Sequence, residues 1–156
     1  MLQLVDDVFS TRSDPSQLQV DEDVLRKLGE IHPATLSDYD DGEGPAVWIL
    51  VIPTTEKTMR LFLDGAIPEN ELLARTSPGE KFEAIYLCSA TVLPEFRKKG
   101  LARKLTVEAI ENIRKDHGIR FLYVWPFTPE GDRLAEKIAA ITGLPLLKKI
   151  SGHARH

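Results

Sequence analysis

The sequence predicts a fold that contains both helices and strands (α/β, or α+β with a mixed sheet). Helices are expected to flank a central mixed β-sheet within one domain, residues 1–156. Three observations support this prediction. A chain of 156 residues has the length of one domain with one core. Its composition is that of a globular protein, with 42% apolar and 28% charged residues. In its second half, apolar runs of strand length alternate with helical patterns, which favours right-handed crossovers and parallel strands.

The first predicted elements are a helix and a loop. Asp21 is expected to cap a helix whose apolar residues keep helical spacing up to Ile31, just before Pro33. The Asp- and Gly-rich segment "LSDYDDGEGP", residues 36–45, is then expected to be a loop. Its acidic part can attract a basic substrate.

A buried strand and two helices follow. The run "AVWILVI", residues 46–52, is apolar on both faces and indicates a strand covered on both sides. Capping threonines predict a helix over residues 54–65, and Pro68 near a first turn predicts another over residues 67–76.

The remaining elements alternate strictly. Helices are predicted where apolar residues recur at helical spacing between capping residues, and strands where branched and aromatic residues cluster. The predicted order is a strand over 82–92, a helix over 100–118 that Gly118 closes, a strand over 119–125, a helix that begins at Thr128 and Pro129 and ends at Gly143, and a strand over 144–150.

Composition also narrows the classes of function. The net charge of −4 argues against general binding of nucleic acid, and the longest apolar run is far below the ~20 residues that span a membrane. Cys88 is the only cysteine, which fits a reducing compartment. The start "MLQLVDD" is not expected to act as a signal sequence. We therefore expect a soluble cytoplasmic protein without nucleic-acid or membrane partners.

Five of the twenty basic residues surround Gly100, where a predicted strand gives way to a helix. They are Arg97, Lys98, Lys99, Arg103 and Lys104. Cations in a first helical turn oppose the helix dipole, so their presence needs another reason. Free N–H groups at a helix start bind anions, and a glycine lets an anion approach the backbone. The segment therefore predicts a site for a polyanion.

The spacing of this segment differs from a P-loop and from a dinucleotide-binding motif. R-x-x-G-x-A, from Arg97 to Ala102, with the preceding "VLPEF" from Val92 to Phe96, resembles the [RQ]-x-x-G-x-[GA] signature and V-x-P-x-[YF] lead-in of the GNAT superfamily of acetyl-CoA-dependent N-acetyltransferases. The resemblance covers about residues 82–144, and residues 1–81 diverge.

The resemblance implies that acetyl-CoA is the co-substrate. Its diphosphate would lie on the amides of residues 98–103, and its pantetheine beside the strand that ends at residues 91–93. The residues expected to bind it are Val92, Leu93, Arg97, Lys98, Lys99, Gly100, Leu101, Ala102 and Arg103.

The catalytic groups do not follow the family pattern. Ala139 stands where members of the family often have a tyrosine that donates a proton to the departing thiolate. Asp132 stands where they have an asparagine. The position of the glutamate base of histone-acetylating members is occupied here by Ala84. Glu83 and Tyr86 are the remaining candidates for a catalytic role. The alternative for Glu83 is a surface charge, and the alternative for Tyr86 is a packing role in the core. Cys88 is expected to be a small buried residue.

The ends of the sheet also differ from the family. Only 13 residues follow Gly143, which is room for one strand, so the sheet is reduced at its C-terminal end. A second subunit can complete such a sheet, which makes a homodimer an open alternative.

Smaller features have structural explanations. His32, His117, His153 and His156 lack metal-ligand spacing, so no metal site is expected. His117 is expected to be a cation, because a positive charge is favoured at a helix C-terminus. Trp48 and Trp125 are expected in the core.

Three functions remain. The first is transfer of an acetyl group from acetyl-CoA to a small-molecule or protein amine by direct attack. The alternative is a catalytically inactive protein of the same fold that binds CoA or acyl-CoA. The third is a docking patch for a protein or nucleic acid, formed by Lys98, Lys99 and Arg103.

Overall fold

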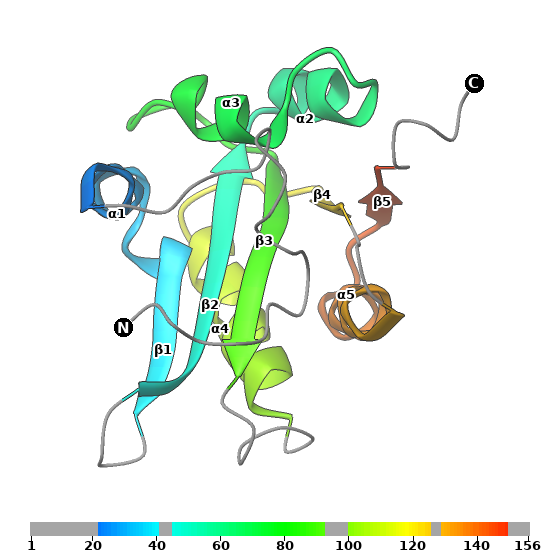
Figure 1. The fold of residues 1–156 in the computed structure, drawn as a ribbon. Helices are drawn as coiled ribbons and strands as arrows, with labels where there is room; N and C mark the ends of the chain where they lie inside the picture. The colour runs from blue at the N-terminus through cyan, green and yellow to red at the C-terminus, as the bar shows by residue number, and fades with distance from the viewer. Residues whose placement is uncertain (1–21, 41–44, 93–99, 126–128, 150–156) are drawn as a thin grey trace.

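The structure is a computed structural model that describes residues 22–40, 45–92, 100–125 and 129–149. Figure 1 shows the arrangement of the elements. In chain order these are α1 (Glu22–Ile31), a short 3-10 helix (Pro33–Thr35), β1 (Leu36–Asp40), β2 (Pro45–Thr54), α2 (Glu56–Leu63), α3 (Glu69–Ala74), β3 (Ala84–Val92), α4 (Leu101–Arg114), β4 (Phe121–Val124), α5 (Pro129–Thr142) and β5 (Leu146–Lys148).

The strands form one mixed sheet in the order β1-β2-β3-β4-β5. β1, β2 and β3 pair antiparallel, whereas β3, β4 and β5 pair parallel. The parallel strands are joined by α4 and α5, as expected for strands that need crossover connections. The predicted α/β fold with a mixed sheet is therefore confirmed.

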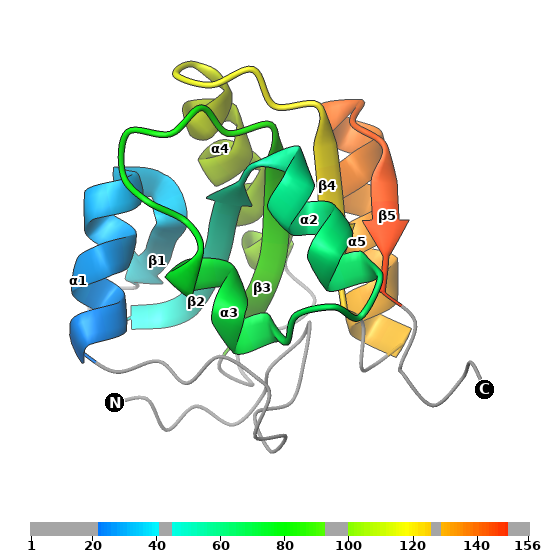
Figure 2. The ribbon, with the colours of Figure 1, turned by 90° about the horizontal axis from the view of Figure 1, so that it is seen from above.

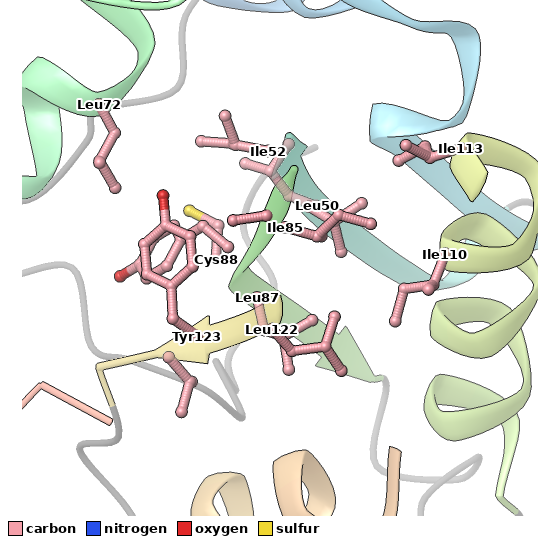
Figure 3. Close-up of a cluster of buried hydrophobic side chains, with 14 of the residues drawn as sticks. Leu50, Ile52, Leu72, Ile85, Leu87, Cys88, Ile110, Ile113, Leu122 and Tyr123 are labelled. Carbon is pink, nitrogen blue, oxygen red and sulfur yellow. The ribbon is translucent and has the colours of Figure 1, made fainter. Parts of the chain in front are cut away.

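Helices cover both faces of the sheet. α4 and α5 pack against each other on one face, and α2 and α3 cover the other, while α1 lies beside the edge strand β1 (Figures 1 and 2). Side-chain alternation along the strands divides the core accordingly. Figure 3 shows Cys88 and Tyr123 on the side of Leu72 from α3, and Ile110 and Ile113 extending from α4 on the other side.

An aromatic cluster fixes α2 over β3 and β4. The ring of Phe62 lies 5.1 Å from that of Tyr86, 5.9 Å from that of Tyr123 and 5.9 Å from that of Trp125. Each such pair adds about 0.5–1.5 kcal/mol beyond the burial of its area. Trp125 is buried, as predicted, but Trp48 is only half-buried.

The predicted loop over residues 36–45 is wrong in its first half, because residues 36–40 form β1. This strand exists through its ladder with β2, for example Leu36 opposite Leu50, which no local pattern reveals. As an edge strand it leaves Leu36 and Tyr39 exposed by 39% and 38%. Residues 41–44 lie outside the described part of the chain.

β2 is longer than predicted and includes the prolines at both ends of the apolar run. Pro53 lies beyond Leu50, the last residue that pairs with β1, so among the described strands only β3 pairs with β2 there. A proline without an N–H is tolerated at such a position.

α4 ends at Arg114, four residues before the predicted stop at Gly118. The N–H groups of Asp116 and His117 both bind the carbonyl of Ile113, at 3.0 Å, so a turn replaces the last helical turn. The other helices begin and end close to their predicted bounds, and Gly143 closes α5 with a φ of 75°. The predicted caps Asp21 and Thr128 lie outside the described residues.

Candidate functional site

The sheet opens between β3 and β4. The two strands pair from Ala84 opposite Phe121 to Leu87 opposite Val124, and β3 then continues to Val92. Within the described residues, no strand pairs with the β4-facing side of β3 beyond Leu87. Ligands of α/β proteins bind beyond the carboxyl ends of parallel strands, so this opening is a candidate site.

A β-bulge lies at the same level of β3. In the ladder with β2, Leu50 is opposite Ser89 and Val51 is opposite Leu87, which makes Cys88 an extra residue. A bulge bends its strand and changes the direction of side chains. The bulge therefore coincides with the point where β3 separates from β4.

Gly100 precedes the first turn of α4 in a left-handed conformation, with φ 73° and ψ 13°. A Cβ at this position would lie 3.0 Å from Nη2 of Arg103, whose guanidinium lies over the glycine. The glycine offers no side chain that could cap the helix. Within the described residues, no side chain caps the N–H groups of the first turn, which can therefore bind another acceptor.

The first turn of α4 contains cations and no acid, since Arg103 and Lys104 are exposed there. By contrast, α1, α2 and α3 all have acidic residues in their first turns, as the helix dipole favours. An anion at the start of α4 would be attracted by the dipole and by the two cations. These residues fit the diphosphate of acetyl-CoA.

Part of the predicted cofactor site lies within the described residues. Gly100, Leu101, Ala102 and Arg103 form the start of α4, and Val92 is the last residue of β3. Ala102 also packs on the core. The remaining predicted residues, Leu93, Arg97, Lys98 and Lys99, lie outside the described residues. Of the predicted docking patch, only Arg103 is therefore described.

Glu83 lies just before the first residue of β3, whereas Val92 is the last residue of that strand. Its Oε1 accepts a hydrogen bond from the backbone N–H of Glu56 at 3.0 Å. At about 3.3 Å a residue, it is roughly 16 Å along the strand from Cys88. The side chain of Glu83 therefore contacts the first residue of α2 and lies away from the opening.

Tyr86 is fully buried and points toward α3. Its hydroxyl donates a hydrogen bond to Oε2 of Glu69 at 2.5 Å. Burial raises the pKa of Tyr86 well above its usual value, and the negative charge of Glu69 raises it further. Tyr86 is therefore a neutral phenol that donates to a carboxylate.

Glu69 is the functional candidate that the sequence analysis missed. It begins α3 and has 0% of its surface exposed. Cys88 Sγ lies 4.0 Å from the oxygen that Tyr86 binds. The sequence contains a signal for this burial, because Glu69 precedes the buried Leu72 and Leu73 by three and four positions and so shares their helix face.

Tyr123 occupies the equivalent place on β4, but its partner is neutral. Its hydroxyl lies 2.8 Å from Oγ1 of Thr54, and burial raises its pKa. Tyr86 is opposite Tyr123 in the sheet, with ring centroids 5.0 Å apart. The two buried tyrosines thus differ in whether they contact a carboxylate.

Asp132 does not add a free negative charge near the cofactor site. Its Oδ1 lies 2.8 Å from the ammonium group of Lys148 on β5, which also pairs with Glu136. These hydrogen bonds raise the pKa of Lys148. Asp132 therefore joins α5 to β5.

The expectation of a cationic His117 is not supported. Its Nδ1 accepts a hydrogen bond from the N–H of Phe82 at 3.4 Å, and burial lowers its pKa, as does His32. The described residues contain no group of three or more His, Cys, Asp or Glu that could hold a metal. Among the same residues, no helix is both long enough and apolar enough to cross a bilayer.

Comparison with known families gives a match in the second half of the chain. Residues 71–133 match a family model described as an acetyltransferase (GNAT) domain. No curated protein and no solved structure matches the chain. The matched residues include β3, the Gly100 turn, α4 and β4, which build the opening. This match supports membership of the GNAT superfamily, and the mixed sheet with its flanking helices is consistent with that fold.

Proposed function

We propose that the protein is an N-acetyltransferase that moves an acetyl group from acetyl-CoA to an amine by direct attack. The start of α4 carries this proposal: it has a left-handed glycine, N–H groups that no described side chain caps, and first-turn cations without an acid. Acetyl-CoA supplies an activated acetyl thioester.

The chain offers two sets of groups to hold this co-substrate. The N–H groups of residues 101–103 and the Arg103 guanidinium bind the diphosphate, through charge-assisted hydrogen bonds of about 1.5–3 kcal/mol each. The side of β3 that β4 leaves beyond Leu87 offers backbone donors and acceptors to the extended pantetheine arm. N–H groups on that side can also donate to the thioester oxygen as negative charge grows on it.

A protein that binds CoA without transferring an acetyl group is the second candidate. Ala139 on α5 favours it, because an alanine cannot protonate a departing thiolate. The cofactor would then bind in the same way, but no acetyl group would be transferred.

Two measurements separate these functions. Acetyl-CoA at one hundred times its dissociation constant is expected to stabilise the protein by about 2.7 kcal/mol, visible as a higher melting temperature. Release of free thiol from acetyl-CoA is then followed with a library of primary amines. Thiol release that depends on the amine supports the transferase. Binding without release supports the CoA-binding protein, and no binding overturns both.

A further inference from the structure

We propose that Asp38 and Trp48 bind a second positive charge of the acceptor, so that the preferred acceptor is a long aliphatic diamine or polyamine. One amine of such a molecule is acetylated, while another lies between the Asp38 carboxylate and the Trp48 ring. This substrate class rests on the transferase function proposed above.

The contacts of Ser37 distinguish the two faces of β1 and β2. Together with Asn112 and Lys115, which follow one another along the α4 side, Ser37 lines a surface hollow, so its side chain is on the face that α4 covers. Successive side chains of a strand alternate between faces, so Asp38 is on the opposite face. Trp48 is opposite Asp38 in the ladder and therefore shares this face.

Both side chains are accessible to a ligand. Asp38 is exposed and Trp48 is half-buried. Leu50, two residues further along β2 on the same face, is only 3% exposed, so the buried core of this face ends between Leu50 and Trp48. Within the described part of the chain, no basic side chain pairs with the Asp38 carboxylate. Its charge is therefore available to a cationic ligand.

The pair combines two groups that recognise an organic cation. Opposite residues of an antiparallel ladder have Cβ atoms about 4.5–5.5 Å apart, so one ammonium group can contact both side chains. The carboxylate of Asp38 attracts its charge, and the face of the Trp48 ring attracts a cation within about 6 Å of its centre. A neutral chain end would gain neither attraction, and an anion would be repelled.

The pair also lies at a suitable distance from the expected thioester. Trp48 is opposite Thr91 of β3, beyond Leu87, which is the last residue that pairs with β4. Acetyl-CoA bound beside this part of β3 would lie two strand spacings from β2 and three from β1. At about 4.8 Å a spacing, these distances are about 10 Å and about 14 Å. A long diamine or a polyamine has its two charges far enough apart to bridge them.

Charge complementarity favours a cationic acceptor over an anionic one. β1 contains two acidic residues, Asp38 and Asp40, and no basic residue. It belongs to the acidic segment for which the sequence predicts attraction of a basic substrate. The start of α4, by contrast, has the cations Arg103 and Lys104 and no acid. The acceptor and the diphosphate thus differ in charge, as do the residues expected to bind them.

The chain offers a matched control for each variant. Asp64 is exposed at the end of α2, so Asp64→Asn removes one surface charge away from the pair. Figure 1 shows α2 beyond the end of β2, and Trp48 precedes that end of the strand, Thr54, by roughly 20 Å. Tyr39→Leu removes an exposed ring from the other face of β1.

The test compares three acceptors of equal chain length at saturating acetyl-CoA. They are n-octylamine, diaminooctane with an amine at each end, and aminooctanoic acid with a carboxylate at the far end. Release of free thiol gives kcat and KM for each. An exposed ion pair and an exposed cation–π contact together should favour the diamine over n-octylamine about tenfold in kcat/KM, counted per reacting amine. Aminooctanoic acid should be the poorest acceptor, because Asp38 repels its carboxylate.

The variants divide this preference between the two side chains. Asp38→Asn and Trp48→Leu should each raise the KM of the diamine about threefold with kcat unchanged. Both should treat n-octylamine as the wild type does, since leucine keeps an apolar surface for its chain. Added salt should lower the preference for the diamine more in the wild type than in Asp38→Asn. Asp64→Asn and Tyr39→Leu should keep the wild-type preference.

Each other outcome has a distinct meaning. A diamine that reacts no faster than n-octylamine, or a wild-type preference in Asp38→Asn, overturns the subsite and leaves the transferase intact. Binding of acetyl-CoA without thiol release from any amine overturns the subsite and the transferase together and favours the CoA-binding protein. If Trp48→Leu is unfolded by circular dichroism, Asp38→Asn decides the matter, because it changes only an exposed group.

Discussion

Replacing Gly100 with glutamate perturbs the predicted diphosphate site most directly. Its φ of 73° is unfavourable for a residue with a Cβ, which costs about 1–2 kcal/mol. The new side chain would also displace the Arg103 guanidinium, which lies 3.0 Å from the Cβ position. At about 2–4 °C for each kcal/mol, the melting temperature should fall by about 2–8 °C.

Gly79→Glu is the control for this strain and for the added charge. Gly79 has a φ of 92°, and nothing lies within 4 Å of its Cβ position. It is exposed and lies in the connection between α3 and β3. Both variants should therefore lose a similar amount of stability, and only Gly100→Glu should affect the cofactor.

The expected loss of binding follows from the contacts at the helix start. Losing one charge-assisted hydrogen bond, worth about 1.5–3 kcal/mol, weakens binding about 10- to 100-fold, and repulsion by the new carboxylate adds to this. Calorimetric titration of wild type, Gly100→Glu and Gly79→Glu with acetyl-CoA measures the effect. Equal affinity in the wild type and Gly100→Glu would refute the assignment of Gly100.

Two further predictions concern buried polar groups. Thr54→Val leaves the buried Tyr123 hydroxyl without its partner and should cost about 1–3 kcal/mol in urea unfolding, and a neutral result would contradict the 2.8 Å hydrogen bond. The pKa of His117 is lowered by burial, so the unfolded chain binds its proton more readily, and stability should fall as the pH drops below about 6.5 toward the folded pKa. His117→Asn keeps an acceptor for the Phe82 N–H and should flatten that fall in melting temperature, whereas an unchanged slope would contradict a neutral His117.

The elements that local patterns specify could be predicted from the sequence. β3, α4, β4 and α5 were expected near their observed positions. The helices combine a periodic apolar pattern with capping residues, and the strands are clusters of branched and aromatic residues. The left-handed Gly100 also agrees with the expectation that the backbone is accessible there. These features depend on residues close together in the chain.

The features that depend on distant residues could not be predicted. β1 is stabilised by its ladder with β2, although Asp38 and Asp40 are poor strand formers. The bulge at Cys88 is a property of the register between β2 and β3. The helix face that Glu69 shares with Leu72 and Leu73 indicates its burial, but its contact with Tyr86 depends on the packing of α3 on β3.

A crystal structure of the complex with acetyl-CoA tests the central claim most directly. The diphosphate should accept hydrogen bonds from the N–H groups of residues 101–103, with the thioester beside β3 beyond the pair of Leu87 and Val124. A diphosphate bound at any other place, or an empty helix start at saturating acetyl-CoA, would contradict it.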